Sequence, residues 1–402
     1  MFLHSPIFII SFFHVLNDGF RIAIIALIPY LAKTLNLTYT QAGFLGSCLV
    51  GIQALTTLPA SMVARKKGDL IVLRAGLICY SIAILALRTS LWYPIAIIIY
   101  SLAGVGFSAF HPIGSAFVAK SSPRNQLGKN LGLMTSAGDL GKIVIPALAT
   151  FLLTKIGWQP TTCILGGLGI LALFTSYGAG SKKKASFIET KVESMRDFIR
   201  KVNLALIKRK AAFVYAVILS ALDCFTQEPI NIFLPFLALS ITGKQEAIGI
   251  ALSAYFAGSL LGKNLLGILA DKRGSFSSLL TAEIGMIIFS FLIGFSKISL
   301  ILYIISFLLG IFSKGTSPVI KTMLGESVSS TSYNIIFGLS ETTDAIADAF
   351  SPVFFGLIAD LASLRTVFLV NIFFIMLMIL FGFSYRKKSL TMIEKLTHAR
   401  SN

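Results

Sequence analysis

The residues of this sequence that could do chemistry are charged side chains placed inside long apolar runs. His14, Asp18 and Arg21 follow one another at intervals of four and three residues, so a helix would carry them on one face. Farther along the chain, Asp139 and Lys142 are three residues apart, so a helix would also carry these two on one face. Ionisable groups in such surroundings are costly and by default indicate function. They predict a polar pathway inside an otherwise apolar chain.

Carboxylates and histidines in these runs are candidates for binding and releasing protons. Burial disfavours the charged form of a carboxylate, so it can exchange a proton near neutral pH, where histidine already titrates. Asp344 and Asp348 are one helical turn apart, and their mutual repulsion favours a proton on one of them. The expected proton-coupling residues are His14, Asp18, Asp139, Asp223, Glu341, Asp344 and Asp348.

Cations in the same runs could bind an anionic solute. The expected substrate-binding residues are Arg21, His111, Lys142, Lys314 and Glu228. The alternative is that these charges are ion pairs that only hold helices together, and for any single residue it stays open. Glu283 is expected to pair or to reach the membrane surface. No metal-ligand spacing or nucleotide-binding loop is present, so neither a metal nor a cofactor is predicted.

The composition identifies the surroundings of these groups as a lipid bilayer. Of 402 residues, 55% are hydrophobic and 13% are charged, whereas soluble proteins carry about 25% charged residues. The net charge of +18 could suggest nucleic acid, but the basic residues fall between apolar runs, as in cytoplasmic loops. We therefore expect a multi-pass protein of the bacterial inner membrane, monomeric and facing an anionic cytoplasmic leaflet, with no nucleic-acid partner.

Twelve apolar runs are long enough to cross a bilayer, which takes about 20 residues. The predicted fold is an all-α membrane protein with twelve transmembrane helices in two six-helix halves. The predicted domains are 1–180, a cytoplasmic basic linker 181–210, a second half 211–388 and a cytoplasmic tail 389–402. The runs are 7–31, 41–64, 71–88, 92–118, 128–154, 158–178, 211–239, 247–270, 277–295, 300–324, 333–360 and 365–383.

Basic clusters follow every second run, which places both termini in the cytoplasm. They include Arg65 to Lys67, Lys120 and Lys272 to Arg273. The linker is also basic, and Phe198, Val202 and Leu206 recur in it at helical spacing. This pattern is typical of an amphipathic helix on the anionic leaflet, although a solvated charge run without a specific role is the alternative.

The two halves are related by a shift of 206 residues. At that offset Pro29 matches Pro235, Pro112 matches Pro318, Pro146 matches Pro352 and Gly132 matches Gly338. Two halves of equal topology indicate a parallel repeat. Proline interrupts helical hydrogen bonding, so we expect the six matched prolines to act as hinges.

One segment carries a family signature. Gly267, Asp271, Lys272, Arg273 and Gly274 form a G-x-x-x-D-K-R-G pattern between the eighth and ninth runs, which resembles the gating motif of the major facilitator superfamily. Residues 11–18 (SFFHVLND) and 104–112 (GVGFSAFHP) are similar to the fosmidomycin-resistance branch of that superfamily, although Ile113 stands where that branch has an acid. The resemblance implies the twelve-helix transporter fold, proton coupling and export.

The function expected from these observations is secondary active, proton-coupled transport of a small organic, anionic solute or drug. Export is favoured, and uptake of a metabolite or a carboxylate siderophore by the same fold is the alternative. A membrane receptor or scaffold that moves no solute is an alternative of another class. An enzyme is not expected, because the runs contain no nucleophile–base pair or metal cluster that the spacing can identify.

Overall fold

The protein is described by a computed structural model covering residues 6–90, 92–123, 126–176, 195–326 and 333–401. Every element in these ranges is a helix, which confirms the all-α prediction. The helices are α1 (Pro6–Ala26), α2 (Ile28–Leu35), α3 (Tyr39–Lys67), α4 (Asp69–Ala86), η2 (Leu87–Thr89), α5 (Tyr93–Ser108), α6 (Phe110–Ser121), α7 (Leu127–Ile156), α8 (Trp158–Phe174), α9 (Met195–Thr242), α10 (Glu246–Arg273), α11 (Ser275–Phe295), α12 (Ser299–Glu326), α13 (Tyr333–Leu361) and α14 (Leu364–Ser401).

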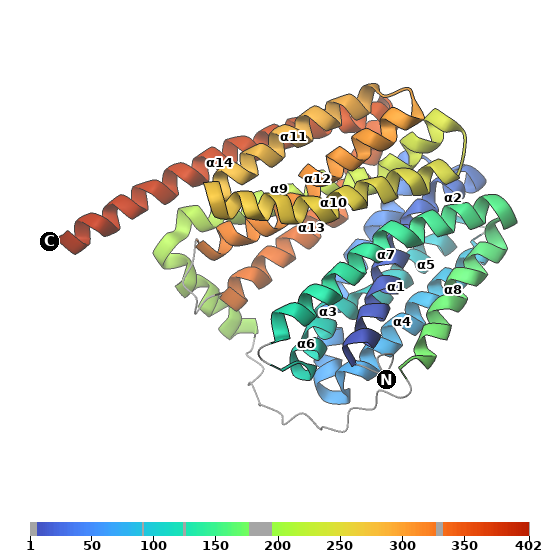
Figure 1. The fold of residues 1–402 in the computed structure, drawn as a ribbon, viewed down its shortest axis with the longest axis horizontal. Coiled ribbons are helices and arrows are strands. Elements are labelled where there is room, and N and C mark those ends of the chain that lie inside the picture. The colour runs from blue at the N-terminus through green and yellow to red at the C-terminus, as the bar shows by residue number, and fades with distance from the viewer. Residues whose placement is uncertain (1–5, 91, 124–125, 177–194, 327–332, 402) are drawn as a thin grey trace.

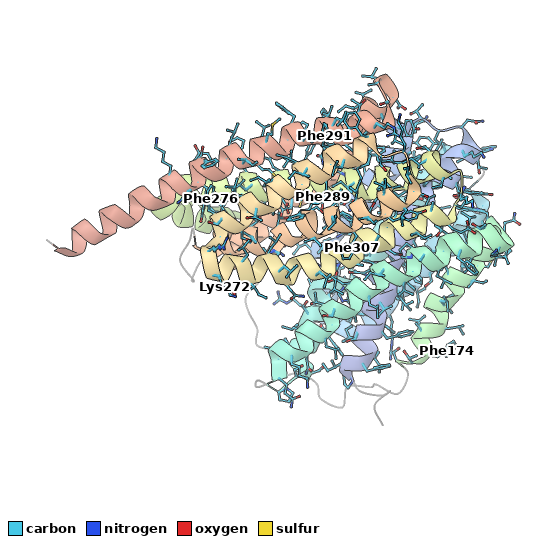
Figure 2. All side chains as sticks on the ribbon, turned by 45° about the horizontal axis from the view of Figure 1, so that its top comes forward. Phe174, Lys272, Phe276, Phe289, Phe291 and Phe307 are labelled. Carbon is cyan, nitrogen blue, oxygen red and sulfur yellow. The ribbon has the colours of Figure 1, made fainter. Side chains whose placement is uncertain are left out.

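The helices have the lengths and surfaces that a bilayer requires. In the described ranges, ten are long and apolar enough to cross one, and α8 is a shorter apolar helix. The acid-bearing α13 is 29 residues long. Large apolar side chains cover the outer surface, with Leu171 62% and Phe174 66% exposed on α8 and Phe291 51% exposed on α11 (Figure 2). A surface of this kind is stable in lipid and would aggregate in water.

The packing of the helices repeats from one half to the other (Figure 1). Helix α1 packs on α7 as α9 packs on α13. Helix α3 packs on α5 as α10 packs on α12, and α4 packs on α8 as α11 packs on α14. The repeat found in the sequence is therefore also a repeat of helix contacts.

Two seams join the halves, α3 against α13 and α7 against α10. At the first, a side chain on Gly43 would overlap the backbone of Pro352. At the second, a Cβ on Gly249 would lie 2.8 Å from Ala147 Cα and 3.0 Å from the Pro146 carbonyl oxygen. Gly43 and Gly249 are 206 residues apart, as are Pro146 and Pro352. Each seam is thus closed by a glycine of one half against a proline segment of the other.

These contacts lie at one end of the molecule, here called the Asp360 end, where α3 begins and α13 finishes. The opposite end, where α10 finishes at Arg273, is called the motif end. Gly128 and Gly132 on α7 and Gly267 on α10, all toward the motif end, face open space. In Figure 1 the two groups of helices meet near α2 and diverge toward the far ends of α6 and α9.

The first two matched prolines accompany helix breaks, and the other four do not. The first span is divided between α1 and α2 at Leu27, two residues before Pro29. The fourth is divided between α5 and α6 at Ala109, three residues before Pro112. Helices α7, α9, α12 and α13 continue through their prolines, so a hinge role there stays a prediction. The continuous helices contain Pro146, Pro235, Pro318 and Pro352.

Helices extend into the predicted linker and tail, and the division of the chain into halves, linker and tail stays a prediction. Helix α9 already begins at Met195, so residues 195–210 continue directly into the seventh span. Helix α14 continues to Ser401 through the expected tail. The linker residues before 195 lie outside the described ranges. The membrane-surface role of Phe198, Val202 and Leu206 stays a prediction, because the structure does not describe their side chains.

Candidate functional site

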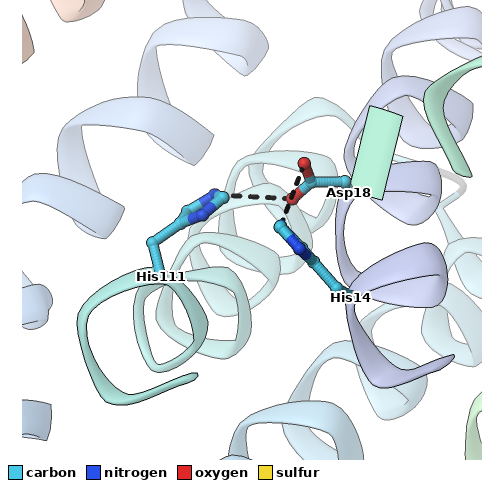
Figure 3. A group of neighbouring side chains, drawn as sticks. All are labelled: His14, Asp18 and His111. Carbon is cyan, nitrogen blue, oxygen red and sulfur yellow. Dashed lines mark ion pairs between the residues drawn. The ribbon is translucent and has the colours of Figure 1, made fainter. Parts of the chain in front are cut away.

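Among the acids whose side chains the structure describes, Asp18 of α1 is buried and lies close to three basic side chains. Its carboxylate lies 3.3 Å from His14 Nε2, 3.4 Å from His111 Nε2 and 2.9 Å from Lys142 Nζ. These partners come from α1, α6 and α7, and Figure 3 shows both imidazole rings directed at the Asp18 carboxylate. The helix break at Ala109 places His111 in the first turn of α6, facing α1.

Small residues allow this cluster to form. A Cβ on Gly138 of α7 would lie 2.7 Å from His14 Nε2 and 2.9 Å from Asp18 Oδ2. One turn later, a Cβ on Gly141 would overlap the Val15 carbonyl group of α1. The sequence pattern Gly138-x-x-Gly141 therefore lets the two helix backbones approach closely enough for their charged groups to meet.

A second acid, Asp139 of α7, connects the two halves. Lys142 Nζ donates to its Oδ1 at 3.1 Å, and Lys263 Nζ of α10 donates to both carboxylate oxygens at 2.8 Å. Lys263 was not among the residues selected from the sequence. It could have been found, because a lysine within the apolar run 247–270 is the same signal that identified Lys142.

Arg21 and Glu228 form another ion pair between the halves. The Arg21 guanidinium of α1 lies 3.1 Å from Glu228 Oε1 of α9 and 5.4 Å from the centre of the Phe107 ring. Asn231 donates to the other oxygen of Glu228 at 2.8 Å. Arg21 and Glu228 were both expected to bind substrate, but in this conformation they form an ion pair with each other.

The acids of the second half have neutral partners. Gln227 and Thr316 donate to Asp223 Oδ1 at 2.6 and 2.7 Å. Ser220 donates to Asp344 Oδ2 at 2.9 Å, and Asp344 Oδ1 is buried without a hydrogen-bond partner. Within the described ranges, none of Asp223, Asp344 and Asp348 has a cationic nitrogen within ion-pair distance.

The structure separates three further residues from this set. Lys314 of α12 is half-buried and makes no ion pair with any described residue. Glu341, expected to couple protons, is exposed and pairs with Lys321 at 3.4 Å. The expectation for Glu283 is wrong: its side chain is 0% exposed, and both carboxylate oxygens lack partners. Glu283 belongs to the buried residues of α11, a helix that packs against α10, α12 and α14.

The residues of the predicted gating motif lie in the last two turns of α10 and directly after it. Asp271, Lys272 and Arg273 are exposed, and Lys272 is labelled in Figure 2. Gly274 has a φ of 84°, a conformation that favours glycine, and it allows the chain to turn into α11. None of the three charged residues forms an ion pair with a described residue in this conformation.

At the Asp360 end, one acid links the halves across the first seam. Asp360 of α13 accepts hydrogen bonds from the backbone N–H groups of Tyr39 and Thr40, each at 2.8 Å, and from Thr40 Oγ1 at 2.6 Å. These N–H groups are unpaired in the first turn of α3, so Asp360 caps a helix of the other half.

Comparison with known proteins agrees with this architecture. The sequence profile described as Major Facilitator Superfamily matches residues 7–236 and 213–400. A multidrug resistance protein MdtG of Escherichia coli is 24% identical over 311 residues, 76% of this chain and 74% of that protein. A multi-drug resistance efflux pump PmrA homolog of Lactococcus lactis is 23% identical over 285 residues, 70% of this chain and 69% of that protein.

Solved structures share the fold. A bacterial homolog of the human lysosomal transporter Spinster, in an inward-facing and unoccupied conformation, superposes with a TM-score of 0.77 at 15% identity, covering 97% of this chain and 98% of that one. The nucleoside transporter NupG, in a structure of a point mutant, superposes with a TM-score of 0.77 at 14% identity, covering 96% of this chain and 99% of that one. The twelve-helix prediction is therefore confirmed at the level of the fold.

Proposed function

Because the chain belongs to the major facilitator superfamily, we propose that this multi-pass membrane transporter is proton-coupled and exports a small organic anion across the bacterial inner membrane. Proton coupling is assigned to the acids of the second half, chiefly Asp344 and Asp348 of α13. Anion binding is assigned chiefly to Lys314 of α12. The resemblance to the fosmidomycin-resistance branch stays a prediction.

The proposal depends on the different partners of the acids in the two halves. In the first half, Asp18 and Asp139 are compensated by Lys142 and Lys263, so they can keep their charge without a proton. In the second half, the partners of Asp344 are neutral, and one of its oxygens has none. A buried carboxylate without a cation is costly when charged, which supports a proton on this group in the conformation described.

Asp348 extends this argument. It lies one turn from Asp344 and within electrostatic range of Glu228, Arg21 and Lys314. The charge state of Asp348 therefore affects both an inter-half ion pair and a cation that could bind substrate. A negative charge on Asp348 after loss of its proton would repel Glu228 and attract Arg21. This would weaken the Arg21–Glu228 ion pair and supplies a route from proton release to rearrangement of the halves.

Lys314 supports an anionic solute. An ammonium group in a membrane span is stabilised by a counter-ion, and Lys314 has no carboxylate within ion-pair distance among the described residues. Lys263 adds a partly exposed ammonium on the neighbouring α10. A carboxylate, phosphate or phosphonate group would neutralise Lys314, whereas Lys263 is already bonded to Asp139.

The direction and orientation have separate support. The relatives named for multidrug resistance favour export. The basic clusters at the motif end favour placing that end in the cytoplasm. With this orientation, the seams closed at the Asp360 end correspond to an inward-facing conformation.

The test begins with purified protein and a panel of organic anions, using citrate, glycerol 3-phosphate and a phosphonate as probes. A ligand that binds the native state raises the melting temperature. The anion with the largest shift is then followed in proteoliposomes with and without an imposed pH gradient. We expect the gradient to drive accumulation, and Asp348→Asn to abolish this accumulation while exchange of solute between the two sides continues.

Glu341→Gln is the matched control. It removes an acid of the same helix, and Glu341 is exposed and already paired with Lys321. It should retain gradient-driven accumulation. The coupling proposal is wrong if the wild-type flux is indifferent to the gradient, or if Asp348→Asn and Asp344→Asn both keep it. Accumulation toward the opposite side would favour uptake, and binding without any flux would favour a receptor.

A further inference from the structure

The cluster on α1 and α6 contains a set of groups that proton coupling does not require. One nitrogen of His14, one nitrogen of His111 and a carboxylate oxygen of Asp18 all lie within 4.8 Å of one another. We propose that His14, Asp18 and His111 bind a divalent transition-metal ion, with one coordination position left open on the exposed side of His111.

Each imidazole nitrogen lies near a different carboxylate oxygen of Asp18, at about the separation that two ligands of one ion have. Zinc binds imidazole nitrogen and carboxylate oxygen at 2.0–2.2 Å, so two ligands at the corners of a tetrahedron lie about 3.4 Å apart. In the structure, His14 Nε2 is 3.3 Å from Asp18 Oδ2, and His111 Nε2 is 3.4 Å from Asp18 Oδ1. Small rotations of the side chains could bring the three groups around one centre.

The tautomer of His14 is the second observation. Its Nδ1 lies 2.7 Å from the Met134 carbonyl oxygen, which can only accept, so Nδ1 carries the hydrogen. In the neutral ring, the lone pair of Nε2 then points into the cluster toward a carboxylate. This Nε2 atom is buried and has no hydrogen-bond partner. Metal-binding histidines commonly hold their second nitrogen against a backbone carbonyl in this way.

Neighbouring rings hold the two imidazoles in place and leave one side accessible. Phe110 stacks on His14 with ring centres 4.7 Å apart, and Phe107 contacts His111 edge-on at 5.2 Å. The side chain of His111 remains 46% exposed, although Asp18 and His14 are buried. An ion could therefore enter from the side of His111, and water or an oxygen of a chelating anion could occupy its fourth position.

Lys142 competes for the same carboxylate. Its ammonium lies 2.9 Å from Asp18 Oδ2, the oxygen that also faces His14. It has an alternative partner in Asp139, whose Oδ1 is 3.1 Å away. A metal ion would displace Lys142 toward Asp139, where Lys263 of the other half already binds. The metal and the ammonium are thus expected to exclude each other at Asp18.

The experiment uses full-length protein purified without a polyhistidine tag, treated with chelator and titrated calorimetrically with zinc chloride. We expect one high-affinity site per chain, with magnesium chloride producing no comparable binding. Removal of an outer-shell partner already weakens metal binding about 10–100-fold, so loss of a ligand in His14→Asn or His111→Asn should weaken it at least that much. The control His398→Asn removes a histidine outside the cluster and should bind as the wild type does.

Lys142→Met provides a readout that a merely structural role of the cluster would not produce. Removing the competing ammonium should tighten zinc binding about tenfold, because the positive charge next to the site is lost. Cobalt chloride gives an independent signal, since a tetrahedral cobalt site absorbs visible light and His111→Asn should remove that absorption. Because His111 is exposed, this variant can fold even if Asp18→Asn cannot.

Three results would overturn the proposal: no zinc binding by the wild type, undiminished binding in both histidine variants, or weaker binding in Lys142→Met. Because these measurements follow binding without flux, they are independent of the proton-coupled transport proposed above. Loss of gradient-driven transport in Asp348→Asn, with zinc binding intact, would separate the two.

Discussion

The hydrogen bonds of Asp360 to the start of α3 lead to a quantitative prediction. This carboxylate of the second half holds two backbone N–H groups and one hydroxyl group of the first half, at 2.6–2.8 Å. A transporter that alternates between two conformations must break these bonds each time the Asp360 end opens. Asp360→Ala should therefore shift the equilibrium toward the conformation in which this end is open.

The size of the shift follows from the contacts. Each hydrogen bond contributes about 0.5–1.5 kcal/mol net, so three contribute at most about 4.5 kcal/mol. Asp360 is exposed, and water replaces part of what is lost, so we take about 2 kcal/mol as the change. Since 1.4 kcal/mol is a tenfold change, the ratio of the two conformations should change by about thirtyfold.

The assay measures the distance between spin labels on Lys33→Cys in α2 and Ala362→Cys after α13, in a background without native cysteines. Asp360→Ala should populate longer distances, and Asp360→Asn should have a smaller effect, because the amide oxygen still accepts. Glu246→Gln is the control, since it removes an acid at the same end that makes no inter-half hydrogen bond among the described residues. The reasoning fails if Asp360→Ala leaves the distance distribution unchanged or shifts it no more than Glu246→Gln.

Three further predictions concern the seams and the buried acids. Gly249→Leu should prevent closure at the Asp360 end, because the leucine side chain would meet the Ala147 backbone. Gly132→Leu is the control, because Gly132 faces open space and this variant should close normally. Crosslinking across the second seam would distinguish the two variants. Lys263→Met should reduce transport, because Asp139 is left with one cation instead of two. Adding Asp139→Asn to this variant should restore part of the transport rate. A double variant that is no faster than Lys263→Met would argue against the Lys263–Asp139 ion pair. Glu283→Met should raise the free energy of unfolding by about 1–3 kcal/mol, because both buried carboxylate oxygens lack partners; an unchanged melting temperature would contradict this.

Some tertiary contacts were already visible in the sequence offset. The spacing of 206 residues that relates Pro146 to Pro352 also relates Gly43 to Gly249, and these four residues form the two seams. The glycine pair was not recognised from the sequence, because 33 glycines are present and nothing local marks those that meet a backbone. Lys263 could have been recognised from its apolar run, but its choice of Asp139 could not, because the partners belong to different halves.

The sequence by itself determined the membrane class, the number of spans and the identity of most buried charges. These properties depend on local composition, since the cost of placing a charged or apolar side chain in a bilayer is set by that residue and its neighbours along the chain.

Only the tertiary structure decided which charge is compensated and which is not. His14 and Asp18 are neighbours on one helical turn, but the approach of His111 from α6 and of Lys142 from α7 makes a four-residue cluster of them. Asp344 has the same type of side chain as Asp18, but its hydrogen-bond partners are neutral. Partner distances across helices depend on how the helices pack, and a linear pattern does not contain them.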